Sequence, residues 1–108
     1  MGTGKSRAAE TVTLPVVWLP EAVSEYYESL RWYGDIAPSL SQRFAQAVED
    51  TGRTVAEHPF RFPVVYKDRR RAGVRRFPYS LFFLVEDTRI VVIACFHGKR
   101  DQQHWQNR

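Results

Sequence analysis

The sequence predicts an α+β fold, in which an N-terminal strand and an antiparallel helical hairpin are followed by a three-stranded antiparallel meander. Three observations support this class. A stretch rich in β-branched residues comes first, two segments with apolar residues at helical spacing follow, and apolar runs typical of strands begin at Val64. We therefore expect all the strands to form one sheet, with the hairpin packed on it.

Length and composition fit one globular domain. The chain has 108 residues, of which 44% are hydrophobic and 14% aromatic, and this content favours a packed core over disorder. We expect residues 1–10 to be a flexible N-terminal segment and residues 11–108 to form the domain. The opening "MGTGKSRAAE" lacks the apolar region of a secretory signal, and no segment reaches the ~20 apolar residues of a membrane span. A cytoplasmic protein without membrane contact is therefore expected.

The N-terminal half reads as a strand followed by two helices. The strand, residues 11–19, contains Pro15, which confines it to a sheet edge or to a late start. The first helix begins at Pro20, a favoured first-turn residue, and continues to about Gly34. In the second helix, Ser39 and Gln42 have capping-box spacing. Pro59 predicts that this helix stops at His58, and the short link "YGDIAPS" predicts an antiparallel hairpin.

The C-terminal half reads as strands. The segments "VVYK" and "AGVRRF" flank a basic stretch, and "EDTR" is the predicted turn between "YSLFFLV" and "IVVIACF". Alternation places Ile90, Val92, Ala94 and Phe96 on one face of the last strand. It places Val91, Ile93, Cys95 and His97 on the other face. Because both faces are apolar, we expect this strand to be central, Cys95 to be a core residue, and His97 to mark where the chain leaves the core.

Positive charge is concentrated in the second half of the chain. Residues 1–60 contain five Lys or Arg and eight Asp or Glu, whereas residues 61–108 contain eleven and four. This asymmetry indicates a polyanion or an acidic protein as partner, because guanidinium groups bind phosphates and carboxylates through paired hydrogen bonds. The alternative is an edge strand that charge protects from aggregation. The predicted partner-binding residues are Lys67, Arg69, Arg70, Arg71, Arg75, Arg76, Lys99, Arg100 and Trp105.

The histidines raise the possibility of RNA cleavage. Cleavage without a metal needs groups that move protons and cations that stabilise the extra phosphate charge. His97 or His104 with Arg75, Arg76 and Arg100 would supply both. A structural His97 at a strand end and an exposed His104 in a polar tail are the alternatives.

The residue pattern gives little support for base stacking, metal binding or a phosphate-binding loop. Trp105 follows a polar turn, where a tryptophan more often covers the edge of the core than stacks on a base. The three histidines and one cysteine lack the clustered spacing of a zinc site, and there is no Gly-rich phosphate loop. We expect neither a metal nor a cofactor.

From Val16 to Trp105 the chain resembles the RelE/ParE superfamily of bacterial type II toxins. The matching segments are "WLPEAVSEYYES", "AEHPFRFP", "GVRRFPYSLFFLVEDTRIVVIACF" and "HGKRDQQHW", in this order. The resemblance implies a small α+β toxin that an antitoxin neutralises, and an acidic antitoxin agrees with the charge of the C-terminal half. It implies one of two targets, DNA gyrase or mRNA on the ribosome.

The matching residues favour the ParE-like, plasmid-stabilisation branch, which implies inhibition by binding. RelE-like nucleases carry basic residues on the middle strands, which Arg75 and Arg76 match, and an arginine after "GK", which Arg100 matches. Their "YR" pair is replaced by Tyr79-Ser80, and no tyrosine follows Arg100. A ribosome-dependent mRNA endonuclease is the first alternative. A degenerate, non-toxic member that binds only its antitoxin is the second.

Overall fold

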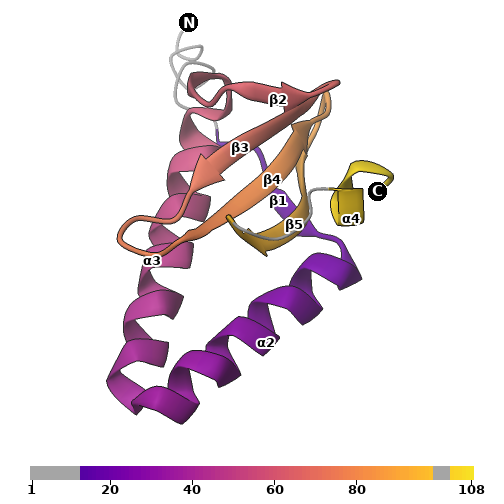
Figure 1. The fold of residues 1–108 in the computed structure, drawn as a ribbon. Helices are drawn as coiled ribbons and strands as arrows, with labels where there is room; N and C mark the ends of the chain where they lie inside the picture. Colours follow the sequence, from indigo (N-terminus) through magenta and orange to yellow (C-terminus); the bar gives the residue numbers. More distant parts are fainter. Residues whose placement is uncertain (1–12, 99–102) are drawn as a thin grey trace, which may run out of the picture.

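The computed structural model describes residues 13–98 and 103–108, so the predicted N-terminal segment 1–10 lies outside the described residues. It confirms the α+β class and the order of strand, helices and strands (Figure 1). The elements are β1 (Val16–Trp18), α2 (Pro20–Ile36), α3 (Pro38–Glu57), the short 3-10 helix η1 (Pro59–Arg61), β2 (Val64–Tyr66), β3 (Arg69–Gly73), β4 (Tyr79–Val85), β5 (Ile90–His97) and α4 (Gln103–Gln106).

All five strands form one sheet in the order β1-β5-β4-β3-β2. The pairs from β2 to β5 are antiparallel, whereas β1 runs parallel to β5, so the sheet is mixed. Four strands follow the helices where the sequence predicts three. The difference arises because the chain turns at Lys67 and Asp68, with a φ of 50° at Lys67, and the basic segment becomes strand β3. As Pro15 predicts, β1 is a short edge strand that begins at Val16.

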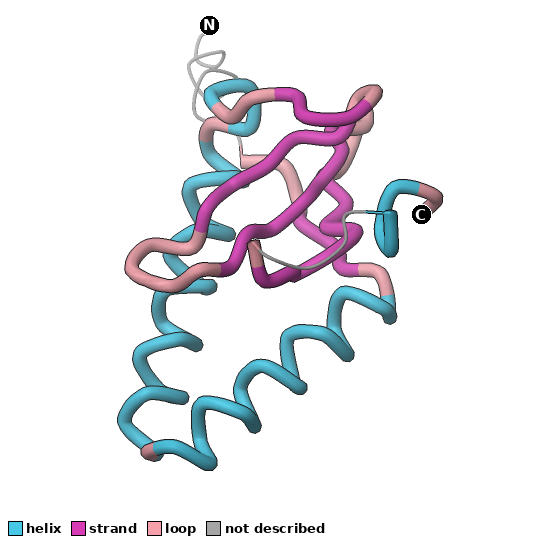
Figure 2. The backbone as a smooth tube through the Cα atoms, viewed as in Figure 1, coloured by secondary structure: helices cyan, strands magenta, loops and turns pink. Residues whose placement is uncertain are grey.

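The helical hairpin is tighter than predicted. α2 continues past Gly34 to Ile36, and the extended residue Ala37 alone separates it from α3. The two helices meet at this point and diverge from it (Figure 2). The predicted capping box at Ser39 and Gln42 is wrong, because α3 already begins at Pro38 and its N-terminus has no side-chain cap in the described chain. α3 ends at Glu57, one residue before the predicted stop.

α2 and α3 pack on one face of the sheet, which we call the helix face. Its centre is the fully buried ring of Phe44, which contacts the rings of Tyr33, Phe77 and Tyr79 with centroids 5.1 Å apart in each pair. Ring pairs at this separation add to the stabilisation that burial gives. This cluster fixes both helices to the turn between β3 and β4.

A β-bulge changes the faces of β5. Phe82 pairs with Ala94, but the next residue, Phe83, pairs with Val92, so Ile93 is the extra residue on β5. The helix face therefore receives Ile90, Val92 and Cys95. The opposite face, which we call the outer face, receives Val91, Ile93, Ala94 and Phe96. Val91 and Ile93 lie on a common face, as predicted. From Ala94 onward the predicted faces are wrong, because the extra residue exchanges the two faces for the residues that follow it.

The C-terminal residues cover part of the outer face. Trp105 of α4 is fully buried and stacks on Phe82, with ring centroids 4.2 Å apart and planes inclined by 21°. Its ring also meets the edge of Tyr66 at 6.1 Å. The expectation that Trp105 covers the core is confirmed.

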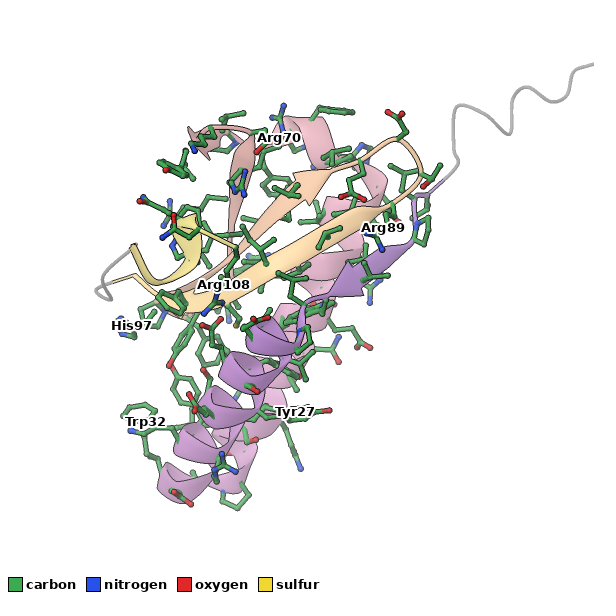
Figure 3. All side chains as sticks on the ribbon, turned by 90° about the vertical axis from the view of Figure 1, so that its right-hand side faces the viewer. Tyr27, Trp32, Arg70, Arg89, His97 and Arg108 are labelled. Atoms are coloured by element: carbon green, nitrogen blue, oxygen red, sulfur yellow. The ribbon has the colours of Figure 1, made fainter. Side chains whose placement is uncertain are left out.

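β5 is central, as predicted, but its partner β1 ends at Trp18. Beyond this residue, Glu25 of α2 accepts a hydrogen bond from the Cys95 amide at 3.0 Å. Arg108 donates to the Ile93 carbonyl at 3.0 Å and forms an ion pair with Glu25 at 2.8 Å. Figure 3 shows Arg108 where β5 passes α2. Two side chains thus replace the missing strand along this edge.

This arrangement predicts that Glu25→Ala destabilises the fold strongly. The side chains of Glu25 and Arg108 are only 12% and 17% exposed, and the substitution leaves the Arg108 guanidinium without its carboxylate partner and the Cys95 amide without its acceptor. We expect a loss of at least about 2 kcal/mol in the free energy of unfolding, measured by urea denaturation. Asp50→Ala is the control, because its pair with Arg53 is more than half exposed and contributes less than about 1 kcal/mol. Equal losses in the two variants would contradict the role of Glu25.

Candidate functional site: a basic groove

The turn between β3 and β4 carries the two arginines that the sequence places on a strand. Arg75 and Arg76 are exposed and lie in this turn, so the predicted strand "AGVRRF" is wrong beyond Gly73. The buried Val74 closes the turn, since its amide donates to the Tyr79 carbonyl at 2.8 Å. Arg76 has a φ of 71°, an uncommon conformation for a residue with a side chain. The alternation of side chains along a strand, which would direct Arg75 and Arg76 to opposite faces, therefore does not apply to them.

Arg75 and Arg76 line a groove of about 700 Å³ between this turn and α3. Exposed Arg43 of α3 lines it as well, and half-buried Ala47, Phe62 and Phe77 contribute apolar surface. We call this site the basic groove. Asp50 also borders it, but its carboxylate already accepts hydrogen bonds from Arg53 and Gln46. The basic groove combines positive charge with apolar surface, as a site for an acidic amphipathic segment requires.

Sequence reasoning missed Arg43 as a member of this site. It lies three residues after Leu40 and four before Ala47, both of which also line the groove. Helical spacing therefore places it beside the apolar stripe of α3. That signal was present in the sequence, but the neighbouring turn is a tertiary feature that the spacing does not show.

The other predicted cations do not gather at this groove. Because Ala72 belongs to the helix-face core, strand geometry directs Arg70 to the helix face and Arg69 and Arg71 to the outer face. Lys67 is exposed in the turn between β2 and β3. Lys99 and Arg100 lie outside the described residues. The described basic residues therefore occupy two faces of the sheet and two turns, rather than the single surface expected from sequence.

Two of these arginines hold the structure together. Arg70 donates to the Phe62 carbonyl at 2.6 Å, and its guanidinium lies 5.1 Å from the centre of the Phe60 ring. Arg69 binds Asp68 and the carbonyl of Arg108, and its side chain is only 18% exposed. Their place on the partner surface stays a prediction, but both guanidinium groups already have protein partners.

Trp105, His97 and His104, the other candidate residues, differ in burial and position. Trp105 is fully buried, so a partner would reach its ring only if α4 moved. His97 ends β5, as predicted, and lies against the Tyr79 ring with centroids 5.2 Å apart. His104 belongs to α4, but its side chain lies outside the described part of the chain.

The described residues of the predicted nuclease set do not converge. His97 borders one cavity of about 660 Å³ beside α2 and another of about 210 Å³ on the outer face. Neither of these cavities includes Arg75 or Arg76, which line the basic groove. An acid or base acts through a hydrogen bond to the reacting group, so it must share one site with the cations that stabilise the phosphate.

Two further findings concern metals and membranes. Within residues 13–98 and 103–108, no three metal-binding side chains of His, Cys, Asp or Glu come together. No helix of this described part is long and apolar enough to cross a bilayer.

Cys95 is buried, as predicted for a core residue, and burial raises the pKa of its thiol from 9.0 to about 12. The nearby Glu25 carboxylate contributes to the same shift, because it repels a thiolate. A thiol that stays protonated at neutral pH is a poor nucleophile.

Comparison with known proteins gives one matching family model and eight chains of solved structures with a similar fold, of which one is described below. The family model described as ParE toxin of type II toxin-antitoxin system, parDE, matches residues 16–102. A solved chain from the chromosomal ParDE TA system from P. aeruginosa superposes with a TM-score of 0.70 and 15% identity. The match covers 79% of this chain and 96% of that chain, and at this identity it shows a shared fold. A comparison with curated proteins gives no significant match.

The raised pKa predicts that Cys95 resists alkylation. At pH 8 only about one thiol in 10⁴ would be ionised with a pKa of about 12, against about one in ten for an ordinary thiol. We expect iodoacetamide to modify the native protein at least about 100-fold more slowly than the protein in urea. Fast modification without urea would show that the thiol is accessible and ionised.

The same shift makes stability depend on pH. The unfolded thiol ionises near pH 9, whereas the folded thiol stays protonated until about pH 12. The contribution to stability is therefore complete below pH 9 and is lost as the pH rises from 9 to 12. Urea denaturation across this range should show a smaller decline for Cys95→Ala than for the unchanged protein.

Proposed function

We propose that this chain, which belongs to the family of ParE toxins of type II toxin-antitoxin systems, inhibits growth by binding DNA gyrase and is neutralised by an acidic antitoxin. The family match over residues 16–102 carries the proposal, since it spans every strand of the sheet and both long helices. Gyrase acts in the cytoplasm, so we propose that the toxin and its antitoxin meet there.

The geometry supports inhibition by binding more than catalysis. His97, the described histidine of the predicted nuclease set, and the set's described arginines, Arg75 and Arg76, border different cavities. The one cysteine has a pKa near 12 and is buried. Binding needs only an accessible surface of suitable charge and shape, and the exposed grooves provide this.

We propose the basic groove as a contact for the antitoxin. Arg43, Arg75 and Arg76 supply positive charge there, while Phe62 and Phe77 supply apolar surface. An acidic segment that folds on binding could place its carboxylates against the arginines and its apolar side chains against the rings. The acidic partner expected from the charge asymmetry of the sequence thus has a defined candidate site.

Expression of the toxin without antitoxin tests the target. We expect growth to stop, DNA breaks to appear and purified gyrase to lose supercoiling activity in the presence of the protein. If growth stopped while gyrase stayed active and ribosome-bound mRNA was cut, the ribosome-dependent endonuclease would be the correct alternative. Unaffected growth together with tight antitoxin binding would identify a degenerate, non-toxic member.

The basic groove predicts the effect of removing its charges. The double variant Arg75→Ala, Arg76→Ala should bind the acidic antitoxin encoded beside the toxin at least about tenfold more weakly, because two charge-assisted contacts are lost. Calorimetry at several salt concentrations should also show a shallower salt dependence. Arg89→Ala is the matched control, because Arg89 pairs with Glu86 in the turn at the opposite end of β4. Equal effects of the two changes would argue against the groove.

A further inference from the structure

A second, smaller cavity of about 210 Å³ lies on the outer face of the sheet. Arg71, His97 and Trp105 bring polar groups to its lining, and Val65, Phe82 and Phe96 bring apolar groups. It shares no lining residue with the basic groove, which lies between α3 and the turn from β3 to β4. It is therefore a separate candidate site, and its existence does not depend on the proposed antitoxin contact.

Arg71 is held in place but not neutralised. Its Nε donates to the Ser80 hydroxyl at 3.0 Å, a bond between neighbouring strands that fixes the guanidinium plane. Among the described residues, its terminal Nη atoms have no acceptor and Arg71 forms no ion pair. An arginine oriented in this way presents two parallel N–H groups, which match the two oxygens of a carboxylate.

Trp105 brings a donor that has no acceptor within the described part of the chain. Its ring is fully buried between the outer face and the cavity, and its Nε1 has no hydrogen-bond partner. A buried indole N–H normally has a partner, and leaving it unpaired is unfavourable because the group has lost its hydrogen bond to water. The atom is covered in this conformation, so a ligand oxygen would reach it only after a small shift of α4.

We propose that this outer-face cavity binds a carboxylate, supplied by an Asp or Glu side chain of a partner polypeptide. The Nη groups of Arg71 bind the two oxygens, and the Trp105 indole N–H turns toward one of them. Ser80 acts as a positioning residue, because it fixes the orientation of Arg71. The apolar walls receive the side chain next to the acidic one.

The surroundings favour a carboxylate over a phosphate of a nucleic acid. Among the described residues, Arg71 is the one arginine that lines the cavity. Arg69, on the same face of β3, already binds Asp68 and the Arg108 carbonyl. A nucleic-acid backbone carries repeated charges and is usually bound by several cations along a groove. The described lining of this small cavity, with its one guanidinium and its aromatic walls, fits a single charged group that has an apolar neighbour.

The test uses the full chain labelled with ¹⁵N and three probes. The probes are the peptide Ac-Gly-Glu-Leu-NH₂, the same peptide with Gln in place of Glu, and inorganic phosphate. NMR titrations follow the Nε–H signal of Arg71 and the indole N–H signal of Trp105. We expect saturable shifts with the Glu peptide and at least about tenfold weaker binding of the Gln peptide and of phosphate.

Variants show whether Arg71 is responsible. Arg71→Gln should weaken binding of the Glu peptide at least about tenfold, and Arg71→Lys should weaken it nearly as much, because lysine keeps the charge but loses the paired donors. Ser80→Ala should weaken it severalfold while the charge remains. Arg89→Gln is the matched control, since it removes the same charge in the turn between β4 and β5, outside this cavity, and should leave binding within about twofold.

Several results would overturn the proposal. They are unchanged binding in Arg71→Gln, equal binding of the Glu and Gln peptides, and tighter binding of phosphate than of the Glu peptide. Because Arg71 is exposed, its replacement should leave the fold intact, which the remaining backbone amide signals verify. None of these results depends on toxicity or on gyrase, so this proposal and the proposed function can fail separately.

Discussion

The backbone amides and carbonyls of the central strand β5 point to both of its edges and each needs a hydrogen-bond partner, yet β1 covers only the first residues of one edge. The structure meets this requirement with a bulge and an ion pair. The extra residue Ile93 turns its own carbonyl and the Cys95 amide to the uncovered edge, where Arg108 and Glu25 bind them. This requirement connects α2, the sheet and the C-terminal segment, and it places Trp105 over the outer face.

The helices and strands could be predicted from the sequence better than the face of the sheet on which each strand residue lies. The apolar stripes of the two helices and the turn residues Pro20 and Pro59 mark segments whose period is unambiguous. The bulge at Ile93 could not be predicted, because both faces of β5 are apolar and a one-residue shift leaves the pattern unchanged. The ion pair of Glu25 and Arg108 joins residues 83 positions apart, and neither residue has a local signature.

The candidate sites show that the number of charged residues in a segment does not predict which of them form a binding surface. Residues 67–76 contain six Lys or Arg, but composition does not distinguish an arginine that holds two segments together from one that faces solvent. Arg70 binds the Phe62 carbonyl, while its neighbour Arg71 lies on the opposite face beside a cavity. Only the register of β3 separates these roles, and the register depends on pairing with β4. The same basic run thus contributes to structure and to two different surfaces.

The parallel pairing of Val16 with Ile90 joins nearly opposite ends of the described chain. β5 is the last of the described strands in sequence, but it lies between β1 and β4 in the sheet. A nascent polypeptide in which β5 has not yet been synthesised therefore lacks the strand with which β1 pairs. The sheet face on which its helices pack is also incomplete. The topology links conformational order to the synthesis of β5, so a translation product interrupted before Ile90 would lack the folded surface of the domain.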